Sequence, residues 1–289
     1  MKISVIIPHR GREEQLLSCL GALEEQTMDR DKYEVIVAGH VRKELSESLG
    51  PGTRYIKAVG EEEEFSTAAM RNLGIREAEG DVLLFLDCDM LLPEAFLENL
   101  RENMKGGSKM LFALRKRLPR ETDPQRAKFK RIKCPRDERE VARAMLNVSY
   151  ENIETIWLWA YSHTMCVRRK DITALGGFRE EFSGWGMEDT ELAYRFFREG
   201  IPIICDHKSR CYHMWHRENY DRKRQRGYRE NIEILRSIYK EPLLEGLDLC
   251  FGCFNTAAAA MAGGDMTPSY VCGLCMFEAY ARGLYKKGK

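Results

Sequence analysis

The chain has 289 residues, an apolar share of 44% and a formal net charge of +1. These values are those of a globular protein with one large domain and room for an appendage. A net charge near zero excludes a global field that attracts nucleic acid, and no apolar run approaches the roughly 18 residues of a membrane-spanning helix. We therefore expect a cytoplasmic protein without a nucleic-acid partner, and peripheral contact with a membrane stays open.

Strand and helix patterns alternate from the first residue. β-branched runs and apolar residues at helical spacing predict, in chain order, strand 2–7, helix 13–25, strands 33–39 and 53–59, helix 66–78, strand 81–87, helix 93–103 and strand 109–114. Strand 81–87 is apolar nearly throughout, as in parallel strands buried on both faces. The alternation predicts an α/β fold with an open, mainly parallel sheet between two layers of helices. Ligands of such sheets bind at the carboxyl ends of the strands.

The pattern is interrupted over 115–145, which is basic and contains Pro119, Pro124 and Pro135. The remaining expected elements are a strand at 159–169, a helix from 188, strands at 201–206 and 209–216, and a charged helix at about 228–240. The stretch 243–285 is rich in Ala, Met and Cys and differs in composition from the rest. We therefore predict a main domain over 1–240 and a small helical, cysteine-rich appendage over 241–289.

Two acids, Asp87 and Asp89, follow the apolar strand in the sequence FLDCDML. Two carboxylates separated by one residue at a strand end can share a divalent cation with the phosphates of a ligand. A D-x-D pattern alone is common by chance. Its position at the end of a buried strand, within the alternating part of the chain, favours a ligand site.

Three blocks of the sequence occur in the order and spacing of a known family. They are ISVIIPHRGR at the first strand, AMRNLGIREAEGDVLLFLDCD in the middle and GGFREEFSGWGMEDTELAYRFFREG downstream. With them, residues 1–240 resemble GT-A glycosyltransferases of the family 2 type. The last block is similar to the C-terminal region of β-1,4-galactosyltransferases and polypeptide N-acetylgalactosaminyltransferases. The resemblance implies the GT-A fold, a Rossmann-like open mixed sheet flanked by helices that binds nucleotide-diphospho-sugars.

The resemblance implies a nucleotide-binding turn at IPHRGR, formed by Pro8, His9, Arg10 and Arg12. His9 departs from the aromatic residue usual at its position, although an imidazole can also stack on a base. Arg71 matches a family residue that contacts the nucleotide and its phosphates, and a planar guanidinium suits that role. The alternative for this arginine is a solvated position on a helix.

The resemblance also implies a metal site. Asp89 would be a direct ligand, with Asp87 nearer the ribose or reaching the ion through water. A further family ligand is a histidine after the last core strand, where CYHMWHRE offers His213, which we favour, and His216. Mixed carboxylate and imidazole ligands favour Mn²⁺ over Mg²⁺.

The sequence GWGMEDTEL places Trp185 between two glycines, directly ahead of Glu188 and Asp189. In inverting galactosyltransferases the acid at the second position is the catalytic base, so the resemblance points to Asp189 as the base that takes the proton of an acceptor hydroxyl. Glu188 would bind donor or acceptor hydroxyls and Trp185 would offer a flat face to a sugar ring. Gly186 would let backbone and ligand approach closely. The alternative is a helix N-terminus that favours acids, and Glu191 is assigned to that role alone.

The tail carries a separate pattern. Cys250, Cys253, Cys272 and Cys275 have the C-x2-C-x18-C-x2-C spacing of a structural zinc site, although cysteine also serves as a small buried apolar residue. The lysines and arginines of 115–139 indicate either a solvated loop or a surface for an anionic acceptor, a lipid phosphate or a partner protein.

Together these features predict a metal-dependent inverting glycosyltransferase that moves a hexose from a UDP-sugar to an acceptor hydroxyl, with Mn²⁺ or Mg²⁺ as the cofactor. The alternatives are a retaining enzyme of the N-acetylgalactosaminyltransferase type and a non-catalytic module that binds sugar nucleotides. The acceptor stays open between a glycan, a peptide and a small natural product.

Overall fold

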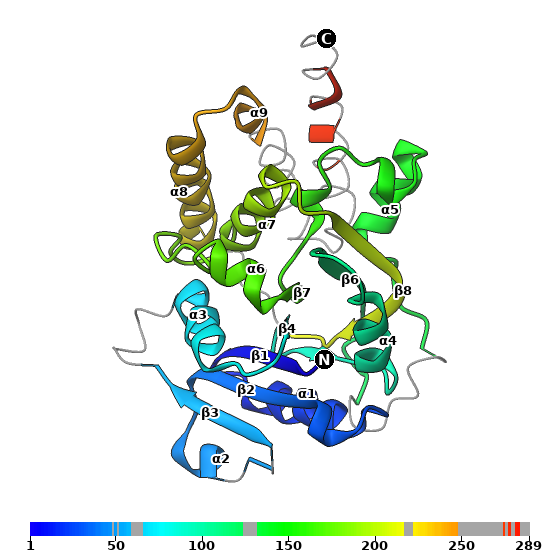
Figure 1. The fold of residues 1–289 in the computed structure, drawn as a ribbon, viewed down its shortest axis with the longest axis vertical. Helices are drawn as coiled ribbons and strands as arrows, with labels where there is room; N and C mark the ends of the chain where they lie inside the picture. Colours follow the sequence, from blue (N-terminus) through cyan, green and yellow to red (C-terminus); the bar gives the residue numbers. More distant parts are fainter. Residues whose placement is uncertain are drawn as a thin grey trace.

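The computed structural model describes residues 1–47, 49–50, 52–58, 66–123, 132–216, 222–247, 274, 277–278 and 281–283. An eight-stranded sheet forms the centre of this part of the chain, with helices on both faces (Figure 1). The strands are β1 (Ile3–Arg10), β2 (Tyr33–His40), β3 (Thr53–Lys57), β4 (Val82–Leu86), β5 (Met90–Leu91), β6 (Met110–Arg117), β7 (Thr164–Arg168) and β8 (Ile203–His213). The helices are α1 (Glu13–Glu24), α2 (Lys43–Glu47), α3 (Thr67–Glu77), α4 (Phe96–Asn103), α5 (Glu138–Leu146), α6 (Arg169–Ala174), α7 (Glu188–Arg198), α8 (Arg222–Tyr239) and α9 (Pro242–Glu245).

Successive residues of each strand pack on opposite faces of the sheet, as the pleat requires. In β4, Leu83 and Phe85 belong to the core that lies under α3, α7 and α8, whereas Val82, Leu84 and Leu86 belong to the core under α1 and α4. All five side chains are fully buried. Burial on both faces explains why this strand reads as a continuous apolar run in the sequence.

The sheet is mixed, in the order β3-β2-β1-β4-β7-β6-β8-β5. The first four of these strands are parallel, as predicted. Beyond β4 the strand directions are mixed: β7 runs antiparallel to both of its neighbours and β5 runs antiparallel to β8, whereas β6 and β8 are parallel. The mixed sheet implied by the family resemblance is confirmed.

Several element boundaries differ from the predicted ones. The turn from Pro93 closes with a bond from the Phe96 amide to the Pro93 carbonyl (2.8 Å), and α4 begins at Phe96. The two strands predicted at 201–206 and 209–216 form the single strand β8, whose register with β6 shifts after Ala113. The strand expected from 159 starts only at Thr164, because residues 156–159 form a buried 3₁₀ turn.

The described residues of the tail pack into the main core. Leu274, Phe277 and Ala281 are buried in the same cluster as the residues of α7, and the Phe277 ring meets Trp157 edge-on at 5.7 Å. The buried Glu278 carboxylate accepts bonds from the Glu154 and Thr155 amides, each at 3.0 Å. The division of the chain at 240 stays a prediction. The four cysteines of the predicted zinc site lie outside the described residues.

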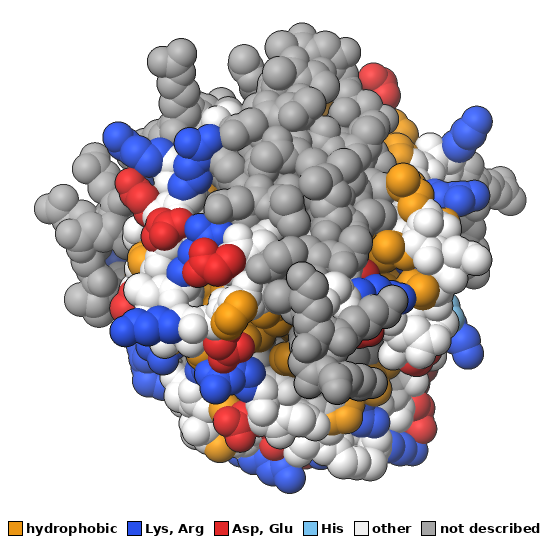
Figure 2. Space-filling model, turned by 90° about the horizontal axis from the view of Figure 1, so that it is seen from above, with side chains coloured by type: hydrophobic (Ala, Val, Ile, Leu, Met, Phe, Trp, Pro, Cys, Tyr) orange, Lys and Arg blue, Asp and Glu red, His pale blue; other side chains and the backbone are white. Residues whose placement is uncertain are grey.

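Charges of both signs are interspersed on the described surface seen from above (Figure 2). This mixture agrees with the formal net charge of +1. Within the part of the chain that the structure describes, no helix is both long enough and apolar enough to cross a membrane.

Candidate active site

The candidate site lies where β1, β4 and β8 end. The two-residue strand β5 pairs Met90 with His213, and the Met214 amide donates to the Asp89 carbonyl at 2.8 Å. These two backbone contacts fix the end of the D-x-D segment against the end of β8. Residues far apart in the sequence, Asp89 and His213, are therefore brought side by side by backbone pairing.

Asp89, His213 and His216 form a cluster whose ligand atoms all lie within 4.8 Å of one another. The Nε2 atom of His213 is 3.7 Å from Asp89 Oδ1, and the Nε2 atom of His216 is 3.2 Å from Asp89 Oδ2. Asp89 Oδ1 is buried and has no hydrogen-bond partner among the described residues. A buried carboxylate oxygen without a donor, beside two imidazoles, fits a divalent cation of the Mn²⁺ type. Both candidate histidines are therefore in the cluster.

The protonation of this cluster also fits a cation. Burial lowers the pKa of His213 to about 3, which leaves its imidazole neutral with a lone pair to offer. Desolvation alone would raise the pKa of Asp89, but His213, His216 and Arg12 outweigh it and hold that pKa well below its usual value. Because His213 is neutral, we attribute the ionised state of Asp89 mainly to the permanent charge of Arg12.

The turn after β1 brings Arg12 to this cluster. Arg12 Nη1 donates to Asp89 Oδ2 and lies 3.2 Å from His216 Nε2. Arg10 is exposed at the end of β1. The Arg12 guanidinium at the edge of the cluster suits the phosphates of a ligand.

Pro8 and His9 lie deeper, inside the sheet. Pro8 is buried opposite Ala38, and the fully buried His9 has its Nδ1 atom 3.1 Å from the His40 carbonyl oxygen. The neighbouring position 39 must be glycine, since a Cβ atom there would lie 2.1 Å from the His9 carbonyl oxygen. In this conformation the His9 ring has no exposed face, and its predicted stacking on a base stays a prediction.

Arg71 bridges two of the predicted acids. Its Nη1 donates to Glu188 Oε1 at 2.8 Å and its Nη2 donates to Asp87 Oδ1 at 3.2 Å, while only 2% of the side chain is exposed. The alternative of a solvated helix arginine is therefore wrong. Burial raises the pKa values of Asp87 and Glu188, and the charge of Arg71 opposes both shifts. The bridge links the D-x-D segment to the start of α7.

Asp189 is half-buried at the first turn of α7, with its carboxylate fixed by neighbours. Oδ2 accepts the Ser162 amide at 3.1 Å and the Ser162 hydroxyl at 3.2 Å, and Oδ1 accepts the Thr190 amide at 2.8 Å. Sequence reasoning missed Ser162. It stands in WAYSH, 27 residues before Asp189, and no spacing rule connects the two.

The loop of Trp185 is held by α8. The rings of Trp185 and Tyr228 pack at 5.4 Å with an interplanar angle of 35°, and Asn231 Nδ2 donates to the carbonyls of Ser183 (2.9 Å) and Gly186 (2.8 Å). Gly186 has a φ of 89°, a conformation that side chains rarely adopt. Trp185 is half-buried, and its role as a sugar platform stays a prediction.

Gly186→Ala is expected to lower the free energy of unfolding by about 1–3 kcal/mol, because the new Cβ would lie 2.7 Å from Tyr228 Cδ2 in a strained backbone conformation. Urea unfolding followed by circular dichroism measures this change. Gly227→Ala is the matched control: outside its own helical turn, no atom of the described residues lies within 4 Å of its added Cβ, and alanine favours a helix by about 1 kcal/mol. Equal stability of the two variants would contradict the close packing of the loop on α8.

Glu191 is more than an acid at a helix N-terminus. It is fully buried, and its carboxylate accepts bonds from Arg179 (3.1 Å), Arg195 (2.8 Å) and the Tyr239 hydroxyl (2.5 Å). The assignment to the helix dipole alone is therefore wrong. The residue lies on the inward face of α7, where a carboxylate needs such partners.

The basic stretch 115–139 contains buried ion pairs. Arg139 is fully buried and its Nη2 donates to Asp137 at 2.6 Å, while Arg115 donates to Glu138 at 3.0 Å. The interpretation of this stretch as an entirely solvated or acceptor-facing surface is wrong for these two arginines. Their carboxylate partners stand at the start of α5 within the same stretch, so the sequence contained the compensating charges.

Comparison with known proteins gives a consistent result. Residues 4–204 match the family model described as glycosyltransferase like family 2. The validoxylamine A glucosyltransferase of Streptomyces hygroscopicus subsp. limoneus is 26% identical over 227 residues, which cover 72% of this chain and 50% of the relative. The chain thus spans about half the length of this relative.

Two solved structures share the fold. TarS of S. aureus (residues 1–349, in complex with UDP) aligns with a TM-score of 0.55 at 16% identity. The alignment covers 98% of this chain and 92% of the TarS chain. The mannosyltransferase PcManGT of Pyrobaculum calidifontis, in complex with GDP-Man and Mn²⁺, aligns with a TM-score of 0.54 at 16% identity. The alignment covers 100% of this chain and 76% of the PcManGT chain. Both alignments extend over nearly all of this chain.

Proposed function

Since the chain belongs to the glycosyltransferase-like family 2, we propose that it transfers a hexose from a UDP-sugar to an acceptor hydroxyl, with inversion and with the help of a divalent cation. The observation that carries this proposal is the position of Asp189. Its carboxylate, held by Ser162 and Thr190, directly follows Glu188, which Arg71 links to the D-x-D segment. The proposed base is therefore next in sequence to a carboxylate that the ion pairs of Arg71 connect to the D-x-D segment.

Asp189 acts as the general base. Its carboxylate takes the proton of the acceptor hydroxyl as that oxygen forms its bond to C1 of the donor sugar. The bond from C1 to the diphosphate oxygen breaks in the same step, and UDP leaves with the electron pair. Ser162 and Thr190 restrict rotation of the carboxylate, so that an oxygen stays directed at the acceptor.

A cation and two arginines would provide the positive charge on the diphosphate side of the site. Asp89, His213 and His216 would hold the divalent cation, which supplies charge that stabilises the leaving diphosphate. Arg10 and Arg12 would bind phosphate oxygens at the edge of that cluster. Support comes from PcManGT, whose complex contains Mn²⁺, and from TarS, whose complex contains UDP.

Glu188 and Trp185 position the sugars. The Arg71 bond fixes Oε1 of Glu188, and the second oxygen of that carboxylate can accept a sugar hydroxyl. Trp185, held by Tyr228, would present its ring to a pyranose at the same loop.

The proposal is tested by UDP release across a panel of UDP-sugars with Mn²⁺, repeated with EDTA, in the presence of mixed glycan acceptors. We expect one donor to be favoured, with metal-dependent release. The anomeric configuration of the product, read by NMR, must be opposite to that of the donor. A product with the donor's configuration would support the retaining alternative, and binding of UDP without any turnover would support the non-catalytic one.

A further inference from the structure

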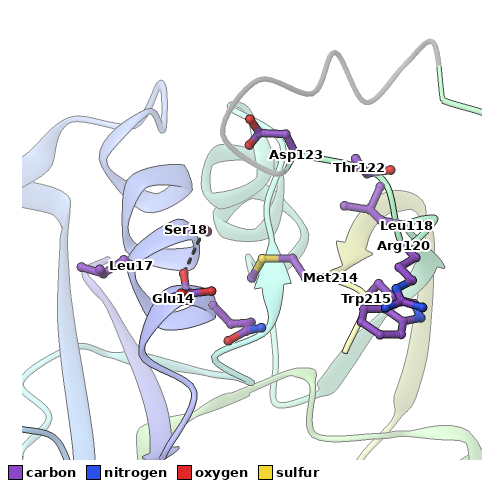
Figure 3. Close-up of a pocket in the computed structure, with 10 residues that line it drawn as sticks. Glu14, Leu17, Ser18, Leu118, Arg120, Thr122, Asp123, Met214 and Trp215 are labelled. Atoms are coloured by element: carbon purple, nitrogen blue, oxygen red, sulfur yellow. Dashed lines mark hydrogen bonds between the residues drawn. The ribbon is translucent and has the colours of Figure 1, made fainter. Parts of the chain in front are cut away.

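A cavity of about 330 Å³ lies between α1, the segment 118–123 and residues 214–215 (Figure 3). Its volume is at the lower end of the range of about 300–1,000 Å³ that is usual for small-molecule sites. Neither Asp189 nor Glu188 lines it. The cavity is therefore a separate feature from the proposed reaction centre.

An exposed tryptophan forms one wall of the cavity. Trp215 is 45% exposed, whereas Trp157 and Trp159 are fully buried. The Arg120 guanidinium carbon lies 4.8 Å from the centroid of the Trp215 ring, and Figure 3 shows the two side chains together at one side of the cavity. A large aromatic ring kept in solvent and oriented by an arginine is a surface to which the C–H face of a flat, amphipathic ligand can bind.

Carboxylates and hydroxyls also line the cavity. Glu14 and Ser18 come from α1, and Thr122 and Asp123 come from the segment that faces it (Figure 3). Carboxylates accept hydrogen bonds from ligand hydroxyls, and the Thr122 hydroxyl can donate or accept. The Ser18 hydroxyl donates to the Glu14 carbonyl at 3.0 Å, so it can accept from a ligand. Polar groups from α1 and from the segment 118–123 thus line the cavity together with an aromatic wall, which is the composition of a site for a polyhydroxylated ring.

The charges of the lining decide between neutral and anionic ligands. Among the described lining residues, the ionisable side chains are the carboxylates of Glu14 and Asp123 and the guanidinium of Arg120, which lies against Trp215. The charge of Glu14 opposes that of Arg120, so these two groups offer a phosphate or a uronate no excess of positive charge. A neutral sugar can instead donate its hydroxyl protons to both carboxylates.

We propose that this cavity is a saccharide-binding site that takes a neutral pyranose ring, with Trp215 against the C–H face of the ring and Glu14 and Asp123 accepting from its hydroxyls. The site adjoins the metal cluster, because Trp215 immediately precedes His216 and Glu14 follows Arg12 by two positions. The role of the bound ring rests on the proposed function. If that function holds, the ring is a unit of the acceptor glycan other than the unit that reacts.

The test uses the full chain labelled with 5-fluorotryptophan and followed by ¹⁹F NMR, with the Trp215 resonance assigned through Trp215→Phe. The probes are methyl glycosides of glucose, galactose, N-acetylglucosamine and N-acetylgalactosamine and their β-linked disaccharides, with methyl glucuronide and inorganic phosphate as charged comparisons. We expect a neutral probe to shift the Trp215 resonance saturably without donor or metal. Arg120→Ala and Glu14→Gln should each weaken its affinity about tenfold. Met145→Ala, a change at an exposed residue of α5 that does not line the cavity, should leave affinity unchanged.

Three results would overturn the proposal: no saturable shift with any neutral probe up to its solubility, tighter binding of glucuronide or phosphate, or equal affinity in Glu14→Gln and wild type. Glu14 is exposed on α1, so its isosteric variant keeps the fold and the test stays decisive. UDP with Mn²⁺ is titrated into the same samples. Failure of UDP to bind would contradict the proposed function and leave the saccharide result standing, whereas UDP binding without a saccharide shift would contradict this inference alone.

Discussion

Asp189→Asn is expected to lower kcat about 10²- to 10⁴-fold, because the amide has the shape of the carboxylate but cannot take the proton of the acceptor hydroxyl. Binding of UDP with Mn²⁺ should stay within about twofold of wild type, since Asp189 is not part of the Asp89–His213–His216 cluster. The measurements are UDP release under saturating donor and acceptor, and calorimetric titration of UDP.

Two further variants calibrate this result. Ser162→Ala removes the hydroxyl that bonds Asp189 Oδ2 but leaves the amide donor at 3.1 Å, so we expect a smaller loss of kcat than for Asp189→Asn. Asp29→Asn makes the same chemical change at an exposed residue and should leave turnover unchanged. Thermal unfolding of each variant confirms that the fold is kept. Wild-type turnover in a folded Asp189→Asn protein would rule out this residue as the base.

Arg71→Met is expected to lower the free energy of unfolding by about 3 kcal/mol, because it leaves the Glu188 carboxylate buried without its ion pair. The side chain of Glu188 is 12% exposed, whereas that of Asp87 is 38% exposed and is partly compensated by solvent. Urea unfolding at pH 7 measures the loss. Arg76→Met, on an exposed position of the same helix α3, is the matched control and should change stability by no more than about 0.5 kcal/mol.

The loss caused by Arg71→Met should depend on pH. Burial, followed by the charge of Asp189, raises the pKa of Glu188 above 4.5, and removal of the arginine raises it further. A carboxyl group whose pKa is higher in the folded than in the unfolded state destabilises the fold once the pH rises above its unfolded pKa. This penalty disappears at a pH low enough for the group to be protonated in both the folded and the unfolded state. The difference from wild type should therefore shrink as the pH falls below the folded pKa of Glu188. A difference that stays constant or grows on acidification would contradict an ion pair between Arg71 and Glu188.

The parallel half of the sheet could be predicted because its signals are local. Strand 81–87 and helix 66–78 each carry a complete apolar pattern, and the structure has β4 at Val82–Leu86 and α3 at Thr67–Glu77. The antiparallel direction of β7 depends on the route of the chain through 115–163, for which no local pattern exists. The two-residue strand β5 is too short to give any pattern, although it is the element that sets Asp89 beside His213.

The sequence identified the residues of the candidate site more readily than the contacts between them. The resemblance identified Asp89, both histidines and Asp189, and the structure brings the first three into one cluster. It gave no indication that Ser162 holds Asp189, because that contact forms only when the segment before β7 packs on α7. Contacts between distant segments follow from packing, and a single sequence contains no direct record of them.

A titration of UDP into the protein, followed by calorimetry with Mn²⁺ and again with EDTA, tests the central claim most directly because it needs neither the donor sugar nor the acceptor. We predict binding of UDP that depends on Mn²⁺ and that is lost in Asp89→Asn, while Asp29→Asn binds as wild type does. Equal affinity with Mn²⁺ and with EDTA, or unchanged metal-dependent binding in Asp89→Asn, would contradict the account of a cation-assisted nucleotide-sugar site at the end of β4.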